Sequence, residues 1–240
     1  MSIKEEKLKE DFIDLISHEM RTPLTTIQWT LEYFLGGFTG EISPLQRDYL
    51  KMAEKDSRRL GVIIDDLIDI YRIQSAKINL KKEKTDILRL INDCILMMKG
   101  DLELKRITVV KRASTYLPYA YIDQQSISDA LIKLLDNAIK FSCTGKEIRV
   151  SAAAADRITI SVEDYGCGID PKMLPRIFKK FEQLTRIIGP GRQGIGLGLS
   201  IAKALVELNG GEIKIESKKG EGTKASIAIP LLKNSEGGRT

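Results

Sequence analysis

His18 is the only histidine of the chain, so any histidine chemistry must use this residue. Glu19 follows it directly, and Thr22 lies four residues after it, about one helical turn away. A carboxylate that accepts one ring N–H makes a neutral imidazole more basic, so that its other nitrogen becomes a better nucleophile. Pro23 lacks a backbone N–H and would interrupt a helix just after this cluster. The pattern favours a nucleophilic histidine over the plain alternative, a surface histidine without function.

Two glycine-rich segments in the second half of the chain have the composition of phosphate-binding loops. Residues 164–168, with the sequence Asp-Tyr-Gly-Cys-Gly, follow a predicted strand and place an acid where the backbone can approach a ligand closely. Residues 189–198 lead into a predicted helix, whose N-terminus favours anions. The spacing fits neither a Rossmann fingerprint, since position 199 is leucine, nor a Walker loop, which needs Gly-Lys-Ser/Thr. Taken alone, residues 189–198 would serve equally well as a hinge loop.

The first third of the chain is predicted to place His18 on a long helix. Apolar residues recur at three- and four-residue steps between positions 12 and 34, and glycines at 36–40 end the pattern. Residues 43–46 (Ser-Pro-Leu-Gln) then combine an N-cap, a proline at the first helical position and a glutamine that can close a capping box. A second helix follows to about residue 71, and two such helices joined by a short loop form an antiparallel hairpin. Polar neighbours place His18 on the solvent side of its helix: Asp11, Asp14, Arg21, Thr22 and Thr25.

Both predicted helices have wide apolar faces, and a hairpin by itself covers only one side of each helix. A dimeric four-helix bundle would cover these faces by joining two copies of the hairpin. The alternative is that the hairpin packs on the C-terminal part of its own chain. We expect a homodimer through the N-terminal helices.

The rest of the chain alternates strand and helix patterns, after a lysine-rich stretch near residues 75–84 that marks a domain junction. Short β-branched runs predict strands at 107–110, 147–150, 157–162, 212–215 and 225–229, with a hairpin turn at 218–222. Helical patterns cover 87–102, 124–141 and 197–208. These elements predict an α/β sandwich with helices over one face of a mixed sheet. The expected organisation of this α + α/β chain is a helical hairpin at 1–77, an α/β domain at 78–233 and a frayed tail at 234–240.

Composition argues against several classes of protein. The chain has 240 residues, 30% of them charged and 42% hydrophobic, and a net charge of +5 that is too small and dispersed to indicate nucleic-acid binding. No apolar stretch approaches the ~18 residues of a membrane span, and the charged N-terminal residues leave no room for a signal peptide. The three cysteines suit a reducing compartment rather than a disulfide framework or a zinc site. We expect a cytoplasmic location for this portion, with any membrane anchor in another part of a longer protein.

The segment Ser17–Leu24 resembles the phosphoacceptor box of the sensor histidine kinases of two-component systems. The pattern of that family is S-H-E-x-R-T-P-L, and every fixed position is present. The resemblance implies that ATP phosphorylates a ring nitrogen of His18, and that the phosphoryl group then passes to an aspartate in the receiver domain of a response regulator. Glu19 resembles the acid that activates the histidine. Thr22 resembles the residue that orients water when such kinases dephosphorylate their regulator.

The C-terminal part resembles the Bergerat-type (GHKL) ATP-binding domain shared by histidine kinases, gyrase, a heat-shock chaperone and mismatch-repair ATPases. In that family an asparagine box binds magnesium and phosphate, an acid binds the adenine amino group, and glycine boxes lie near the phosphates. The resemblance implies ATP and Mg²⁺ as cofactors, with Asn137 as the metal ligand, and a lid over the nucleotide at residues 184–193. It assigns these residues to nucleotide binding: Asn137, Lys140, Phe141, Asp164, Gly166, Gly168, Ile169, Phe181, Arg192, Gln193, Gly194, Gly196, Leu197, Gly198 and Thr223.

Position 133 departs from the pattern of the family. Kinases usually carry asparagine one turn before Asn137, and the related ATPases carry a glutamate that activates water, whereas this chain has Lys133. Because a lysine supplies neither function, it argues against ATP hydrolysis as the main activity. The sequence predicts a histidine kinase core that also dephosphorylates its regulator. The alternatives are a weakly active or non-catalytic scaffold that binds a regulator, and an ATPase of the same fold.

Overall fold

The structure is a computed structural model that describes residues 3–75, 79–114, 116–182 and 195–232. It consists of two compact units, Met1–Ala76 and Lys77–Thr240. The expected lid at 184–193 and the expected tail at 234–240 lie outside the described residues. Within the described residues, no helix combines the length and the apolarity needed to cross a membrane.

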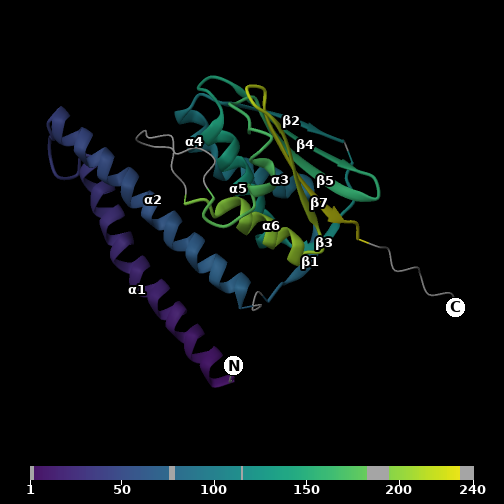
Figure 1. The fold of residues 1–240 in the computed structure, drawn as a ribbon. Helices are drawn as coiled ribbons and strands as arrows, with labels where there is room; N and C mark the ends of the chain where they lie inside the picture. The colour runs from purple at the N-terminus through teal and green to yellow at the C-terminus, as the bar shows by residue number, and fades with distance from the viewer. Residues whose placement is uncertain (1–2, 76–78, 115, 183–194, 233–240) are drawn as a thin grey trace. The chain divides into compact units, whose positions relative to one another are not determined.

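The first unit is a hairpin of two long helices, α1 (Ile3–Leu35) and α2 (Pro44–Gln74) (Figure 1). The capping box predicted at the start of α2 is confirmed. The Gln46 N–H donates to the Ser43 hydroxyl at 3.2 Å, and the Ser43 N–H donates to Gln46 Oε1 at 2.8 Å. Between the helices the chain turns through Gly37 and Gly40, whose φ angles are 81° and 98°, a region that glycine adopts readily. Local residue types therefore set where the hairpin turns.

A small apolar core and two ion pairs join the helices of the hairpin. Leu24 of α1 forms a buried cluster with Ile64 and Ile68 of α2. Arg21 of α1 pairs with Asp65 of α2 at 2.7 Å, and Arg58 of α2 pairs with Glu32 of α1 at 2.7 Å. Exposed pairs of this kind contribute little to stability, so the buried cluster is the main source of packing energy between the helices, and the ion pairs agree with its register.

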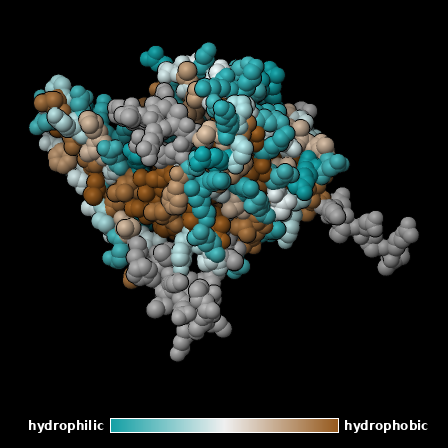
Figure 2. Space-filling view, in the orientation of Figure 1, coloured by the Kyte–Doolittle hydropathy of each residue, from teal (hydrophilic) through white to brown (hydrophobic). Residues whose placement is uncertain are grey.

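Many large apolar side chains of the hairpin remain exposed. Some of them are visible in brown at the end that carries the connecting loop, at the upper left of Figure 2. They lie along both helices and the loop: Leu15, Met20, Ile27, Trp29, Tyr33, Phe34, Phe38, Leu45, Tyr49, Met52, Leu60, Val62 and Leu67. Large exposed apolar surfaces are typical of protein interfaces.

The second unit is built on a five-stranded sheet with the strand order β2-β4-β5-β7-β6. Its strands are β2 (Thr108–Ala113), β4 (Glu147–Ala154), β5 (Arg157–Asp164), β6 (Glu212–Lys218) and β7 (Gly222–Pro230). β2 runs parallel to β4 and the other neighbours are antiparallel, so the predicted mixed sheet is confirmed. Helices α3 (Ile87–Met97), α5 (Gln124–Phe141) and α6 (Gly198–Leu208) cover one face (Figure 1).

The core of this unit lies between the helices and the sheet. Alternate residues of β5, Ile158, Ile160 and Val162, are almost completely buried, as expected for a strand with one covered face. α5 buries Leu131, Leu134 and Leu135 on the other side of this core. Because α5 is packed along its length, the backbone at its C-terminal end is held in place, and so are the Cα positions from which the last side chains extend.

One prediction of local structure was wrong, and one small sheet was not predicted. The helix expected at 87–102 is divided into α3 and α4 (Lys99–Leu104), because Met98 between them has a ψ angle of 5° and the poor helix former Gly100 follows. A small antiparallel sheet of β1 (Lys82–Thr85) and β3 (Ala120–Asp123) was not predicted. Its strands are four residues long, and β1 consists of Lys-Glu-Lys-Thr, which has no apolar alternation.

Candidate functional site

His18 and Glu19 lie side by side on α1, and both are open to solvent. The exposed fractions of their side chains are 79% and 71%, and His18 Nδ1 lies 3.6 Å from Glu19 Oε1. This distance is longer than a hydrogen bond, but a small rotation of two exposed side chains would close it. With Nδ1–H directed at the carboxylate, Nε2 is the nitrogen left with a lone pair. The pair can therefore act as an activated nucleophile on an accessible helix surface.

Thr22 is part of a column of threonines on α1. Its hydroxyl donates to the His18 carbonyl at 3.0 Å, and Thr26 and Thr30 donate in the same way to carbonyls one turn earlier. Because the Thr22 proton is used by the helix, its oxygen lone pairs are directed elsewhere and can accept a hydrogen bond from water. This arrangement suits a group that holds water without being a strong base.

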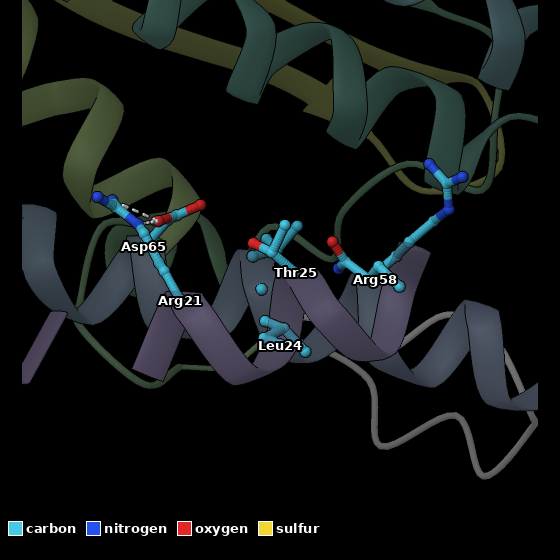
Figure 3. Close-up of a pocket in the computed structure, with 8 residues that line it drawn as sticks. Arg21, Leu24, Thr25, Arg58 and Asp65 are labelled. Carbon is cyan, nitrogen blue, oxygen red and sulfur yellow. Dashed lines mark hydrogen bonds and ion pairs between the residues drawn. The ribbon is translucent and has the colours of Figure 1, made fainter. Parts of the chain in front are cut away.

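An open groove runs between α1 and α2, beginning one turn after His18 (Figure 3). At one end Arg21 donates from Nε and Nη2 to Asp65 Oδ1, at 3.0 and 2.7 Å. Near its middle Gly61 has no side chain, and an added Cβ would lie 3.4 Å from Leu24 Cδ2, in ordinary contact. Five of the eight residues that line the groove are polar or charged, and the lining combines apolar and polar surface: Arg21, Leu24, Thr25, Gln28, Arg58, Gly61, Val62 and Asp65.

The predicted asparagine box occupies the last turns of α5 in the second unit. Asn137 is half-buried, and Phe141 is 38% exposed at the end of the helix. The Lys140 ammonium contacts Asp136 Oδ2 at 2.5 Å, one turn back along the helix. Lys133 is also half-buried, one turn before Asn137. The box is therefore intact as a helical stripe, and its terminal lysine is held by an acid of the same helix.

Lys133 has an acidic residue one turn before it, Asp129. Burial raises the pKa of the Asp129 carboxyl, and the hydrogen bond from Gln125 and the charge of Lys133 act in the opposite direction. Lys133 is therefore close enough to Asp129 for the two charges to interact.

Asp164 ends β5 and is buried, with an exposed fraction of 6%. Its Oδ1 accepts a hydrogen bond from the Gly166 N–H at 2.9 Å. Burial raises the pKa of this carboxyl to about 6, although backbone hydrogen bonds from Gly166 and Thr223 lower it. Perturbed acids of this kind are concentrated at functional sites.

Two glycines after Asp164 are required by close backbone contacts. A Cβ at Gly166 would lie 2.2 Å from the carbonyl oxygen of Phe141, which ends α5. Gly168 has a φ of 61°, and a Cβ there would lie 2.0 Å from the carbonyl oxygen of Lys218. The structure thus brings the glycine-rich segment 164–168 against the end of α5. The sequence alone showed the order of these two segments along the chain but not that they are in contact.

Ser217 is a residue of this region that the sequence did not reveal. Its hydroxyl accepts from the Ile169 N–H at 2.8 Å, donates to the Gly222 carbonyl at 2.7 Å and lies 2.9 Å from Thr223 Oγ1. The hydroxyl therefore joins the turn after Gly168 to the first residues of β7, Gly222 and Thr223. The only signal in the sequence is its position in β6, opposite Thr223 in the predicted hairpin.

The end of the glycine-rich segment 189–198 contacts Phe181. The Phe181 N–H donates to the Gly196 carbonyl at 3.1 Å, and Phe181 is 64% exposed with a φ of 62°. Leu197 is fully buried before the first residue of α6, Gly198, whose Cα faces open space. The predicted phosphate contacts Arg192, Gln193 and Gly194 lie outside the described residues.

Comparison with known proteins assigns both units to families. Residues 8–76 match the family model of the His Kinase A (phospho-acceptor) domain, and residues 122–233 match that of the histidine kinase-, DNA gyrase B- and HSP90-like ATPases. An uncharacterized sensor-like histidine kinase of Rhizobium meliloti (strain 1021) is 30% identical over 224 residues, which are 92% of this chain and 43% of that protein. The alginate biosynthesis sensor protein KinB of Pseudomonas aeruginosa is 29% identical over 94% of this chain and 38% of its own length. The chain spans less than half the length of these relatives.

Solved structures show the same fold. The crystal structure of full-length ShkA in complex with AMPPNP superimposes with a TM-score of 0.73 and 25% identity, over 92% of this chain and 46% of that one. The Acinetobacter baumannii histidine kinase AdeS gives a TM-score of 0.61 with 22% identity, over 90% of this chain and 98% of that one.

The resemblance assigns the adenine amino group to Asp164. On that assignment, nucleotide binding should weaken as the pH falls through about 6, because burial raises the pKa of this carboxyl to about 6 and the ionised form is the stronger hydrogen-bond acceptor. Calorimetric titration with ADP between pH 5 and pH 8 measures this. The Asp164→Asn variant has no carboxyl to titrate at this position. It should bind ADP more weakly than the wild type, and its affinity should change with pH only because the ADP phosphates are protonated. Identical pH profiles for the wild type and the variant would contradict the assignment of Asp164.

Proposed function

The chain belongs to the sensor histidine kinases, of which it carries the catalytic core, and from this premise we propose that it transfers the γ-phosphoryl group of ATP to His18. The observation that carries the proposal is the exposed pair of His18 and Glu19 on α1, separated by 3.6 Å, in a chain with no other histidine. The second unit supports the proposal with the buried carboxyl of Asp164 and with the glycine turn at Gly166, which packs against the end of α5.

In the proposed reaction, His18 Nε2 attacks the γ-phosphorus as the bond to the β–γ bridging oxygen breaks, and ADP leaves with that oxygen. Glu19 stabilises the positive charge that develops on the ring and accepts the Nδ1 proton. Phosphoryl transfer of this kind depends on positioning and charge neutralisation more than on covalent help from the protein.

Magnesium fits the donors that the second unit offers. Asn137 supplies an amide oxygen from α5, and the described residues contain no cluster of three acidic, histidine or cysteine groups that would hold a metal without the nucleotide. Mg²⁺ commonly combines few protein ligands with phosphate oxygens and water. When bound, it would neutralise charge on the phosphates.

The proposed partners follow from the exposed surfaces of the hairpin. A second copy of the chain would cover the apolar side chains of α1 and α2 in a four-helix bundle. The receiver domain of a response regulator would dock in the groove after His18, since its aspartate must reach the phosphorylated ring. Arg21, Arg58 and Asp65 in that groove offer charged groups of both signs for recognition.

Incubation with Mg²⁺ and γ-labelled ATP should label the protein on His18 with a bond that acid breaks. His18→Gln should lose all label but still bind ADP, and Asn137→Ala should lose at least about 10²-fold of the labelling rate because the metal is misplaced. Label that survives acid would contradict the proposal. Steady release of phosphate without label would instead indicate an ATPase, and neither product would indicate a scaffold.

Thr22 and Glu19 should separate two reactions. Thr22→Ala should retain most autophosphorylation but slow dephosphorylation of the regulator, since it removes the group that holds water, whereas Glu19→Gln should mainly slow autophosphorylation. Loss of a positioning or proton-accepting group commonly costs ~10²–10⁴ in rate. Thr22→Ser retains a hydroxyl and serves as the matched control. Equal losses in both reactions for Thr22→Ala would indicate a structural role beside Pro23.

Gly61→Leu should slow phosphotransfer to the regulator about tenfold or more, because its side chain would fill the groove, while autophosphorylation remains. Gly61→Ala is the matched control, since its Cβ makes only ordinary contacts, at 3.4 and 3.6 Å, and alanine is the better helix former. A time course of phosphoryl transfer, with a response regulator identified by phosphotransfer profiling, gives the transfer rate of both variants. If Gly61→Leu transfers at the wild-type rate, the regulator docks elsewhere.

A further inference from the structure

The C-terminal turn of α5 is held by a lysine from outside the helix. The last carbonyls of a helix lack partners and carry the negative end of its dipole. The Lys105 ammonium donates to the carbonyls of Lys140 at 2.9 Å and Ser142 at 3.4 Å, and also to that of Ile139. One ammonium thus satisfies three neighbouring carbonyls where the helix ends.

The backbone around Lys105 is arranged to direct it there. Lys105 is the C-cap of α4, and the next residue, Arg106, has a φ of 53°, which is unusual for a residue other than glycine. The Arg106 N–H bonds to the Glu103 carbonyl and the Ile107 N–H to the Leu102 carbonyl, at 3.0 and 2.9 Å, the pattern of a Schellman turn. The Lys105 carbonyl accepts from the Gly145 N–H at 3.0 Å, so this residue contacts the loop after α5 from both its backbone and its side chain.

The lysine within the helix does not fill this role. Lys140 lies in the last turn of α5, but its ammonium contacts Asp136 one turn back. This contact holds the Lys140 ammonium away from the terminal carbonyls of α5. The positive charge beside those carbonyls comes instead from the Lys105 ammonium.

The end of α5 carries two residues on which the proposed nucleotide site depends. Asn137 and Phe141 lie in its last turns. The Phe141 carbonyl packs against Gly166, and the Gly166 N–H binds the Asp164 carboxylate. A displacement of this turn would therefore move the magnesium ligand and the adenine acid together.

We propose that Lys105 is a positioning residue for nucleotide binding, which fixes the last turn of α5 so that Asn137 and Asp164 face one ligand. The proposal rests on the proposed use of ATP by this chain. The hydrogen bonds from Lys105 to α5 end on backbone carbonyls, so its proposed effect on the nucleotide acts through the position of that turn. Supporting groups of this kind typically change affinity or activity by 10- to 100-fold.

The test uses the whole chain and ADP with Mg²⁺ as the probe. Lys105→Met should weaken ADP binding by about tenfold or more in calorimetric titration, and should speed hydrogen exchange in peptides that cover residues 138–146. Lys99→Met is the matched control, because Lys99 lies on the same short helix but pairs with Glu103 at 3.7 Å. Lys105→Arg restores a positive donor and should recover most of the affinity.

The outcomes are distinct. A lower unfolding temperature for Lys105→Met with unchanged ADP affinity would show a purely structural cap and overturn the proposal, as would equal losses in Lys99→Met. If Lys105→Met does not fold, Lys105→Gln removes the charge but retains a donor, and wild-type affinity in that variant would also overturn it. If the wild type itself fails to bind ADP, the proposed function is wrong, whatever the exchange data show.

Discussion

The nucleotide site depends on one close contact between two backbone segments. The carbonyl oxygen of Phe141 approaches Gly166 so closely that a Cβ there would lie 2.2 Å away. α5 cannot retreat from this contact, because Leu131, Leu134 and Leu135 bury it against the sheet. The turn after β5 must therefore be glycine, and its N–H then falls within reach of the Asp164 carboxylate. A packing constraint in the core thus determines the direction of the acid that ends the strand.

The two units place their reactive groups in opposite environments, for reasons that follow from the chemistry proposed. His18 and Glu19 are exposed because a phosphoacceptor has to meet a nucleotide first and a second protein afterwards. On the proposed assignment of Asp164 to adenine, its burial would exclude water that competes for that hydrogen bond. Burial disfavours the ionised form of Asp164 and raises the pKa of its carboxyl to about 6.

Sequence patterns predicted most of the elements, because they depend on local periodicity and turn residues. The periodicity of α5 gave the bounds 124–141 that the structure has, and the capping residues before α2 marked its start. The break between α3 and α4 was missed because it depends on the dihedral angles of Met98 rather than on proline. Glycine boxes revealed their positions through residue type. The roles of Ser217 and Lys105 were not predicted. The Ile169 N–H that binds Ser217 and the Lys140 carbonyl that binds Lys105 are backbone groups 48 and 35 residues away, and nearly every residue type carries such groups.

Lys133 bears on the proposed phosphoryl transfer through the charges of α5. Each lysine of the box follows an acid by one turn, Asp129 before Lys133 and Asp136 before Lys140. Lys133 thus adds a positive charge where kinases usually carry a neutral asparagine, and it lies one turn after Asp129 and one turn before Asn137. An ammonium at position 133 cannot take a proton from water, as the glutamate of the related ATPases does. Position 133 therefore offers no carboxylate to activate water, which argues against ATP hydrolysis as the main activity and agrees with the proposed transfer to His18.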